Sequence, residues 1–291
     1  MAGKNVTYHT VSGRVRRGSK TQWGSPAVYF CALLAVAVCI GPVLFIILGG
    51  LRSNSEFTTS PAALPKAWKW SQYVEVVNSS DFWGQFSNSA ICAVFTTTGV
   101  VALGVMASYV LARYPVKGRG AMYALFAAGL MFPLTVAITP LYLMIQAMGL
   151  LGTKAGVILP QIAFQLPITI VILVPFLRAI PRELEEAAAI DGSSRLGFFW
   201  RMVLPLSVPG LVTVAILAFV ASWNSYMLPL FILSDTANYT LPLGVAAFAT
   251  EHSVDTAKVL AFTSISMIPA LVFFSIFERR IVGGLTGAVK G

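Results

Sequence analysis

Charged residues are scarce in this sequence of 291 residues. Asp, Glu, Lys and Arg together make up 11% of it, whereas apolar residues make up 57%. An ordinary soluble domain contains about 25% charged residues. A disordered chain combines low hydrophobicity with high charge. Both classes are excluded, because a soluble core of this length cannot hide so much apolar surface.

Cysteine and histidine are also scarce. The cysteines Cys31, Cys39 and Cys92 all lie in apolar runs, and the histidines His9 and His252 stand in separate polar stretches. A disulfide framework or a zinc site needs several such residues at ligand spacing. We therefore expect three buried thiols that act as small core residues, and no metal site.

Long apolar runs are abundant. A bilayer core about 30 Å thick requires roughly 20 helical residues, and six runs reach this length. The first run is too long for a signal peptide, and no small-residue cleavage site follows it, so we expect a retained helix. The sequence predicts an all-α integral membrane protein with six transmembrane helices. They lie at about 27–51, 87–112, 120–148, 155–177, 208–233 and 259–277.

The basic residues are distributed unevenly around these runs. Of the 20 Lys and Arg residues, 15 lie in the N-terminal tail, after the second and fourth runs, and in the C-terminal tail, whereas 5 lie on the opposite side. Cytoplasmic segments of membrane proteins carry such an excess of Lys and Arg. We therefore expect both termini in the cytoplasm. The net charge of +9 then reflects membrane orientation, and we expect no nucleic-acid partner.

Ionisable residues are missing from the interior of all six runs. Ion-coupled transporters usually place such groups there, and acid–base catalysis within the membrane requires them, so neither is expected. Uncharged polar residues do recur in the runs. They either join helices by hydrogen bonds or line a pathway for a neutral, hydroxyl-rich solute. The candidate pathway residues are Asn88, Gln161, Gln165, Asn224 and Tyr226.

The loop between the fourth and fifth runs, residues 178–207, predicts two short helices. Residues 183–190 are strong helix formers with acids in the first turn, where the helix dipole favours them. Gly192 stands where this helix ends. Ser193 or Ser194 can cap a second helix over about 195–203. That helix is unusually rich in large apolar residues, which need burial against the bilayer or a protein: Leu196, Phe198, Phe199 and Trp200.

The same loop carries a recognisable motif. Glu186-Ala187-Ala188, then Gly192, then Leu204-Pro205 resembles the EAA motif of ABC importer permeases, with Met202 where isoleucine is usual. The six runs, the long segment after the first run and the ending GLTGAVKG resemble the carbohydrate-uptake permeases of the maltose-transporter type. The commoner ending of that family has one more residue after the threonine.

This resemblance implies a type I ABC importer permease fold with cytoplasmic coupling helices. It also implies a function, namely half of the translocation pathway for a sugar or oligosaccharide in an ATP-driven, binding-protein-dependent importer. No Walker A pattern occurs in the chain. We expect it to be non-catalytic and without a cofactor, with ATP and Mg bound by a separate ATPase. The implied ATPase-coupling residues are Glu185, Glu186, Ala187, Ala188, Asp191, Gly192, Leu204 and Pro205.

The resemblance further implies the partners and the location. The partners are a second homologous permease subunit in a heterodimer, a cytoplasmic ABC ATPase dimer and an extracytoplasmic solute-binding protein. The location is the cell membrane of a prokaryote. The implied parts are a cytoplasmic tail at 1–26, a permease domain at 27–280 and a cytoplasmic tail at 281–291. Three alternatives stay open: a stand-alone transporter or channel for a neutral solute, an importer of a non-sugar solute, and a membrane scaffold for a cytoplasmic partner.

Overall fold

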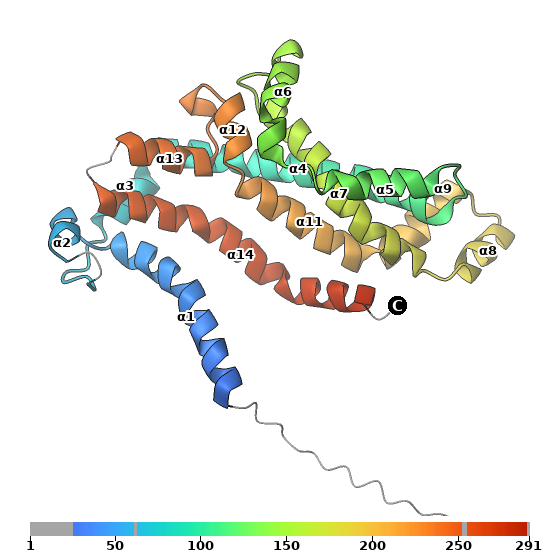
Figure 1. The fold of residues 1–291 in the computed structure, drawn as a ribbon, viewed down its shortest axis with the longest axis horizontal. Coiled ribbons are helices and arrows are strands. Elements are labelled where there is room, and N and C mark those ends of the chain that lie inside the picture. Colours follow the sequence, from blue (N-terminus) through green and yellow to red (C-terminus); the bar gives the residue numbers. More distant parts are fainter. Residues whose placement is uncertain (1–25, 61–62, 252–254, 290–291) are drawn as a thin grey trace, which may run out of the picture. The chain divides into compact units, whose positions relative to one another are not determined.

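The computed structural model describes residues 26–60, 63–251 and 255–289, and within these ranges it contains helices and loops but no strands (Figure 1). The predicted tail at 1–26 lies almost wholly outside them. The chain forms two compact units, one ending at Val43 and the other beginning at Leu44. The predicted tail at 281–291 is helical as far as Val289.

The first unit contains most of the apolar helix α1 (Pro26–Gly49). Cys31 and Cys39 on this helix are exposed, whereas Cys92 is buried. The expectation of three buried thiols was therefore wrong for two of them. A helix that faces lipid keeps its apolar residues on its surface, so an apolar run does not imply burial inside the protein.

The second unit continues with α2 (Asn54–Thr59), α3 (Ser71–Asn78), α4 (Ser80–Arg113), α5 (Arg119–Gly129), α6 (Leu134–Ala147) and α7 (Lys154–Arg178). The loop predicted to hold two helices contains α8 (Glu183–Ile190), α9 (Arg195–Phe198), the π-helical turn η1 (Phe199–Val203) and α10 (Leu204–Leu206). The remaining elements are α11 (Val208–Trp223), α12 (Met227–Ile232), the 3₁₀ turn η2 (Thr236–Asn238), α13 (Leu241–Glu251) and α14 (Thr256–Val289).

Four helices in the described ranges are individually long and apolar enough to cross a membrane: α1, α4, α7 and α14 as far as Ile276. Two further pairs of helices are bent at a short break, and the number of spans reaches six if each pair counts as one span. The predicted run at 120–148 is the pair α5 and α6, bent by 101°. Pro133 precedes α6 in an extended conformation and pushes the residue before it out of the helical region. The second pair joins residues Arg195–Leu206 to α11, with a bend of 74°. The predicted run at 208–233 is broken as well, since α11 ends at Trp223.

The core of the second unit is formed where α4, α7 and α11 pack together. Two glycines on α4 permit this contact. A Cβ atom on Gly99 would collide with Ile162 of α7, and one on Gly104 would collide with Thr169. Small residues at such points let membrane helices approach closely, where van der Waals packing holds them together.

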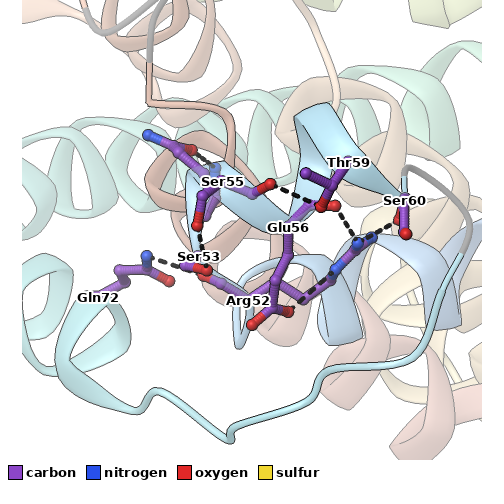
Figure 2. A network of polar contacts seen from close by, with 9 residues as sticks. Arg52, Ser53, Ser55, Glu56, Thr59, Ser60 and Gln72 are labelled. Atoms are coloured by element: carbon purple, nitrogen blue, oxygen red, sulfur yellow. Dashed lines mark hydrogen bonds and ion pairs between the residues drawn. The ribbon is translucent and has the colours of Figure 1, made fainter.

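A buried arginine organises the segment after α1, as Figure 2 shows. Arg52 is 2% exposed. Its Nη2 donates to the carbonyl oxygens of Glu56, at 2.8 Å, and Ser60. Its Nε lies 3.6 Å from the Glu56 carboxylate. Gln72 of α3 donates to the Arg52 carbonyl. A buried charge is tolerated when it is paired and hydrogen-bonded, so Arg52 ties α2 and α3 into one structure.

The same segment is attached to the start of α14. The backbone N–H of Ala257 donates to Asn54 Oδ1 at 3.1 Å. Lys258 forms an ion pair with Glu75 of α3 at 2.8 Å. Tyr73 donates to the carbonyl oxygen of Ile47 at 2.7 Å. Residues 52–60 and 63–78 are therefore a folded part of the second unit.

Candidate functional site

The EAA segment forms helix α8 and the tight turn after it. Glu183, Glu185 and Glu186 occupy the first turn of α8, where carboxylates interact favourably with the helix dipole. The helix ends at Ile190, and Gly192 in the turn after it has a φ of +76°. The N–H of Ser193 donates to the Ala188 carbonyl at 2.9 Å. A left-handed glycine with such a bond is the common way to close a helix.

The second predicted helix is also present, with one irregularity. Ser194 caps α9, because its Oγ accepts from the N–H of Gly197 at 3.0 Å. From Phe199 to Val203 the chain widens into a π-helical turn. Such turns are rare and often occur at functional positions. The turn joins the loop to α10, which contains Leu204 and Pro205.

One face of the predicted coupling loop, residues 178–207, is packed against the protein, and the other face is exposed. Leu184 and Ala188 of α8 pack against a buried cluster that includes Tyr109, Leu177 and Phe199. Met202, at the isoleucine position of the motif, packs against the same cluster, as does Leu204. By contrast, five of the predicted coupling residues are exposed, namely Glu186, Ala187, Asp191, Gly192 and Pro205, and Glu185 is half-buried. The loop therefore presents Glu186 and Ala187 outward, while Ala188 belongs to the packed face.

Gln161 is the centre of a polar contact between three membrane helices. Thr96 Oγ1 of α4 donates to Gln161 Oε1 at 2.9 Å, and Ser222 Oγ of α11 donates to the same oxygen at 2.6 Å. Gln161 is 8% exposed. Its Nε2 is buried and has no hydrogen-bond partner among the described residues. The contact therefore leaves the amide nitrogen of Gln161, with its two N–H groups, without a hydrogen bond to the described residues.

A cavity of about 120 Å³ lies beside this contact. Gln161, Gln165, Ser222 and Ser225 supply its polar lining, and Phe164 and Leu228 are among its apolar residues. The structure thus brings two of the predicted pathway residues, Gln161 and Gln165, to one cavity. It offers uncharged donors and acceptors, which suit hydroxyl groups.

The other predicted pathway residues lie elsewhere. Asn88 Nδ2 donates to the carbonyl oxygens of Ala237 and Tyr239, at 2.8 and 3.0 Å, so its amide holds η2 against α4. Asn224 and Tyr226 are exposed where α11 ends. Neither lines the cavity beside Gln161.

Thr96 was not predicted as a site residue, although it is completely buried and bonds to Gln161. Hydroxyl residues in membrane helices usually bond to their own backbone. Thr169 and Thr213 do so here, four residues back along their helices. The sequence offers no signal that separates Thr96 from them, because its partner lies 65 residues away.

A larger cavity of about 560 Å³ lies at the Ser80 end of α4. Its lining includes Asp81 and Gln85 of α4, Tyr239, and Glu251 of α13. The described residues contain no group of three His, Cys, Asp or Glu side chains placed to hold a metal ion.

Comparisons with known proteins agree with the motif. Residues 100–283 match the family model for the binding-protein-dependent transport system inner membrane component. The diacetylchitobiose uptake system permease protein NgcG of Streptomyces coelicolor is 35% identical over 256 residues, which cover 87% of this chain and 85% of that protein. The trehalose transport system permease protein SugB of Mycobacterium tuberculosis is 36% identical over 270 residues, covering 91% and 98%.

Among solved structures, one chain of a bacterial ABC transporter involved in the import of the acidic polysaccharide alginate has a similar fold. Its TM-score is 0.71 at 21% identity, and the match covers 87% of this chain and 95% of that one. The family match spans the coupling loop and the cavity beside Gln161, and the relatives match over most of their length. The chain therefore belongs to the family of inner membrane components of binding-protein-dependent transport systems.

Proposed function

We propose that this chain is the permease subunit of an ATP-driven importer and that it forms half of the pathway for a sugar or oligosaccharide. The observation that carries the proposal is the coupling loop. Glu186 and Ala187 face outward on a helix whose opposite face, with Leu184 and Ala188, is packed against the buried cluster of the protein. The match to a binding-protein-dependent family supports the same function.

The proposed solute class rests on the relatives and on the cavity. NgcG and SugB are named for diacetylchitobiose and trehalose uptake. The cavity beside Gln161 offers amides and hydroxyls but no charged side chain. A neutral sugar can exchange hydrogen bonds with these groups without a charge being desolvated.

The proposed assembly contains four further components. A second homologous permease completes the pathway, two ABC ATPase chains bind at the coupling loops, and a solute-binding protein docks on the outer side. Both termini of the permease lie in the cytoplasm, in accordance with the distribution of its basic residues. The chain itself is non-catalytic and binds no cofactor, since ATP and Mg belong to the ATPase.

In the proposed mechanism the coupling loop transmits motion as a rigid body. ATP binding closes the two ATPase chains, which displace α8. Because Leu184 and Ala188 are packed on the cluster around Tyr109, Leu177 and Phe199, α8 cannot move far without α4 and α7. The membrane helices then rock between inward-facing and outward-facing states. The unused Nε2 donor of Gln161 provides a transient contact for a sugar hydroxyl in the pathway.

The proposal is tested with a tagged chain purified from its native membrane. We expect the wild type to retain a chain with a Walker A sequence and Glu186→Lys to lose it, since Glu186 is exposed and a charge reversal there alters only what docks on it. Glu251→Lys, at an exposed site on the proposed outer side, is the matched control and retains the ATPase. Uptake of trehalose and diacetylchitobiose then tests the solute class. Equal ATPase recovery with Glu186→Lys contradicts the coupling role.

A further inference from the structure

An apolar groove lies where the Arg113 end of α4 meets α9. Its volume is about 290 Å³. The walls come from both helices, from the residue that follows α4 and from the first residue of η1. They are formed by Met106, Tyr109, Val110, Tyr114, Arg195, Leu196 and Phe199.

The apolar residues of this region divide into two groups. Phe198 and Phe199 are buried in the core cluster, which accounts for two of the four large apolar residues noted in the sequence of this segment. Leu196 is 68% exposed, Trp200 is 61% exposed and Met106 is 59% exposed. Met106 lies seven residues before the end of α4, so the groove extends about 10 Å along the helix. It therefore reaches from the end of α4 toward the hydrocarbon region.

A single positive charge stands at the mouth of the groove. The Arg195 guanidinium lies 5.3 Å from the centre of the Tyr114 ring. Within the described part of the chain no carboxylate forms an ion pair with it. Tyr114 donates to the Tyr109 hydroxyl, and Tyr109 donates to the Arg195 carbonyl. The backbone of Arg195 is thus held to α4, and this bond keeps the guanidinium near that helix. Lys117, in the loop after α4, adds a second exposed cation to this end of the helix.

We propose that this groove binds one anionic phospholipid, with the phosphate at Arg195 and an acyl chain along Met106, Val110 and Leu196. A cation beside an apolar groove at membrane depth matches both parts of such a lipid. A soluble anion would leave the apolar walls uncovered, and a zwitterionic lipid would interact less favourably with the Arg195 charge.

The bound lipid touches two elements that the coupling mechanism must keep together. Met106 and Val110 belong to α4, whereas Leu196 belongs to α9 in the coupling loop. The lipid therefore stabilises the position of the loop against the membrane core. Only this consequence rests on the proposed function, because lipid binding itself requires no more than a membrane-embedded chain.

The test uses the complete transporter purified with its partner subunits and exchanged into nanodiscs that contain phosphatidylglycerol and phosphatidylcholine. Lipids retained after release are counted by native mass spectrometry. One basic residue near a membrane surface contributes enough for about a fivefold preference. We expect Arg195→Gln to lower the phosphatidylglycerol enrichment about fivefold. Arg201→Gln removes an exposed arginine of the same segment that does not line the groove, and it retains the enrichment.

A second variant tests the apolar wall of the groove, and a crosslinking experiment identifies what occupies it. Leu196→Gln leaves the charge in place and weakens retention of both lipids, because it breaks the apolar wall at an exposed position. Recovery of the ATPase at the wild-type level in each variant separates lipid loss from coupling loss. Unchanged enrichment in Arg195→Gln overturns the proposal. So does a photocrosslinker at position 196 that captures another subunit instead of lipid.

Discussion

Gly192 offers the sharpest test of the coupling loop, because a substitution there acts through the backbone alone. Its φ of +76° is in the left-handed region. A Cβ atom added at this position meets nothing within 4 Å. Steric collision therefore contributes nothing to the effect. The cost is the strain of placing an L-residue in a left-handed conformation, about 1–2 kcal/mol.

This penalty is large enough to change which conformation the short loop adopts. A cost of 1–2 kcal/mol lowers the population of the bent conformer by about 5- to 30-fold relative to an unstrained alternative. Gly192→Val carries the full penalty, since β-branched residues are poorly tolerated at positive φ. Gly192→Asn carries less, because asparagine visits this region readily. We expect Gly192→Val to lower recovery of the ATPase at least about fivefold, and Gly192→Asn to stay near the wild type.

The measurement is the amount of ATPase that co-purifies per permease chain, with membrane insertion checked by the yield of tagged chain. Insertion should be equal for all three proteins, because Gly192 is exposed outside the apolar core. The reasoning fails if Gly192→Val binds the ATPase as the wild type does. It fails equally if valine and asparagine cause the same loss, since the effect then does not follow backbone strain.

Three further predictions concern the rest of the second unit. Thr96→Val removes one hydrogen bond to Gln161 and should cost about 0.6 kcal/mol in a detergent unfolding titration; the same cost in a Gln161→Leu background contradicts a direct bond. Gly104→Val should destabilise the chain by about 1–3 kcal/mol through collision with Thr169, and adding Thr169→Ala should restore part of the loss. Burial raises the pKa of Tyr73 above its ordinary value of 10.0. The folded state therefore favours the neutral phenol, and the free energy of unfolding should fall as the pH rises above about 10. Tyr73→Phe should flatten this part of the profile of stability against pH.

The sequence predicted those features that depend on local chemistry. Apolar runs of sufficient length located α4 and α7, and the left-handed turn at Gly192 followed from its place after a short acidic helix. Met202 packs as expected for an apolar residue at that position of the motif. Each of these features involves residues close together in the chain or a simple requirement for apolar surface.

Features that depend on distant partners were not predictable. An amide in an apolar run needs a hydrogen bond, but nothing near Gln161 in the sequence indicates Thr96 and Ser222. The bonds from Asn88, a predicted pathway residue, to the carbonyl oxygens of Ala237 and Tyr239 were not foreseen either. The bend of 101° between α5 and α6 also escaped prediction, because a proline in a membrane span is compatible with both a kink and a break.

Helix α4 has a mechanical consequence for the whole permease. Near its Ser80 end, Asn88 donates to the Ala237 and Tyr239 carbonyls, and Ser89 accepts from the N–H of Leu241. Near its other end, Tyr109 holds the carbonyl oxygen of Arg195. The 22 residues from Asn88 to Tyr109 belong to one uninterrupted helix, which spans about 32 Å over this stretch. A displacement of residues 237–241 must therefore either break these three hydrogen bonds or move α4 as a whole. Tyr109, at the far end, is bonded to α9.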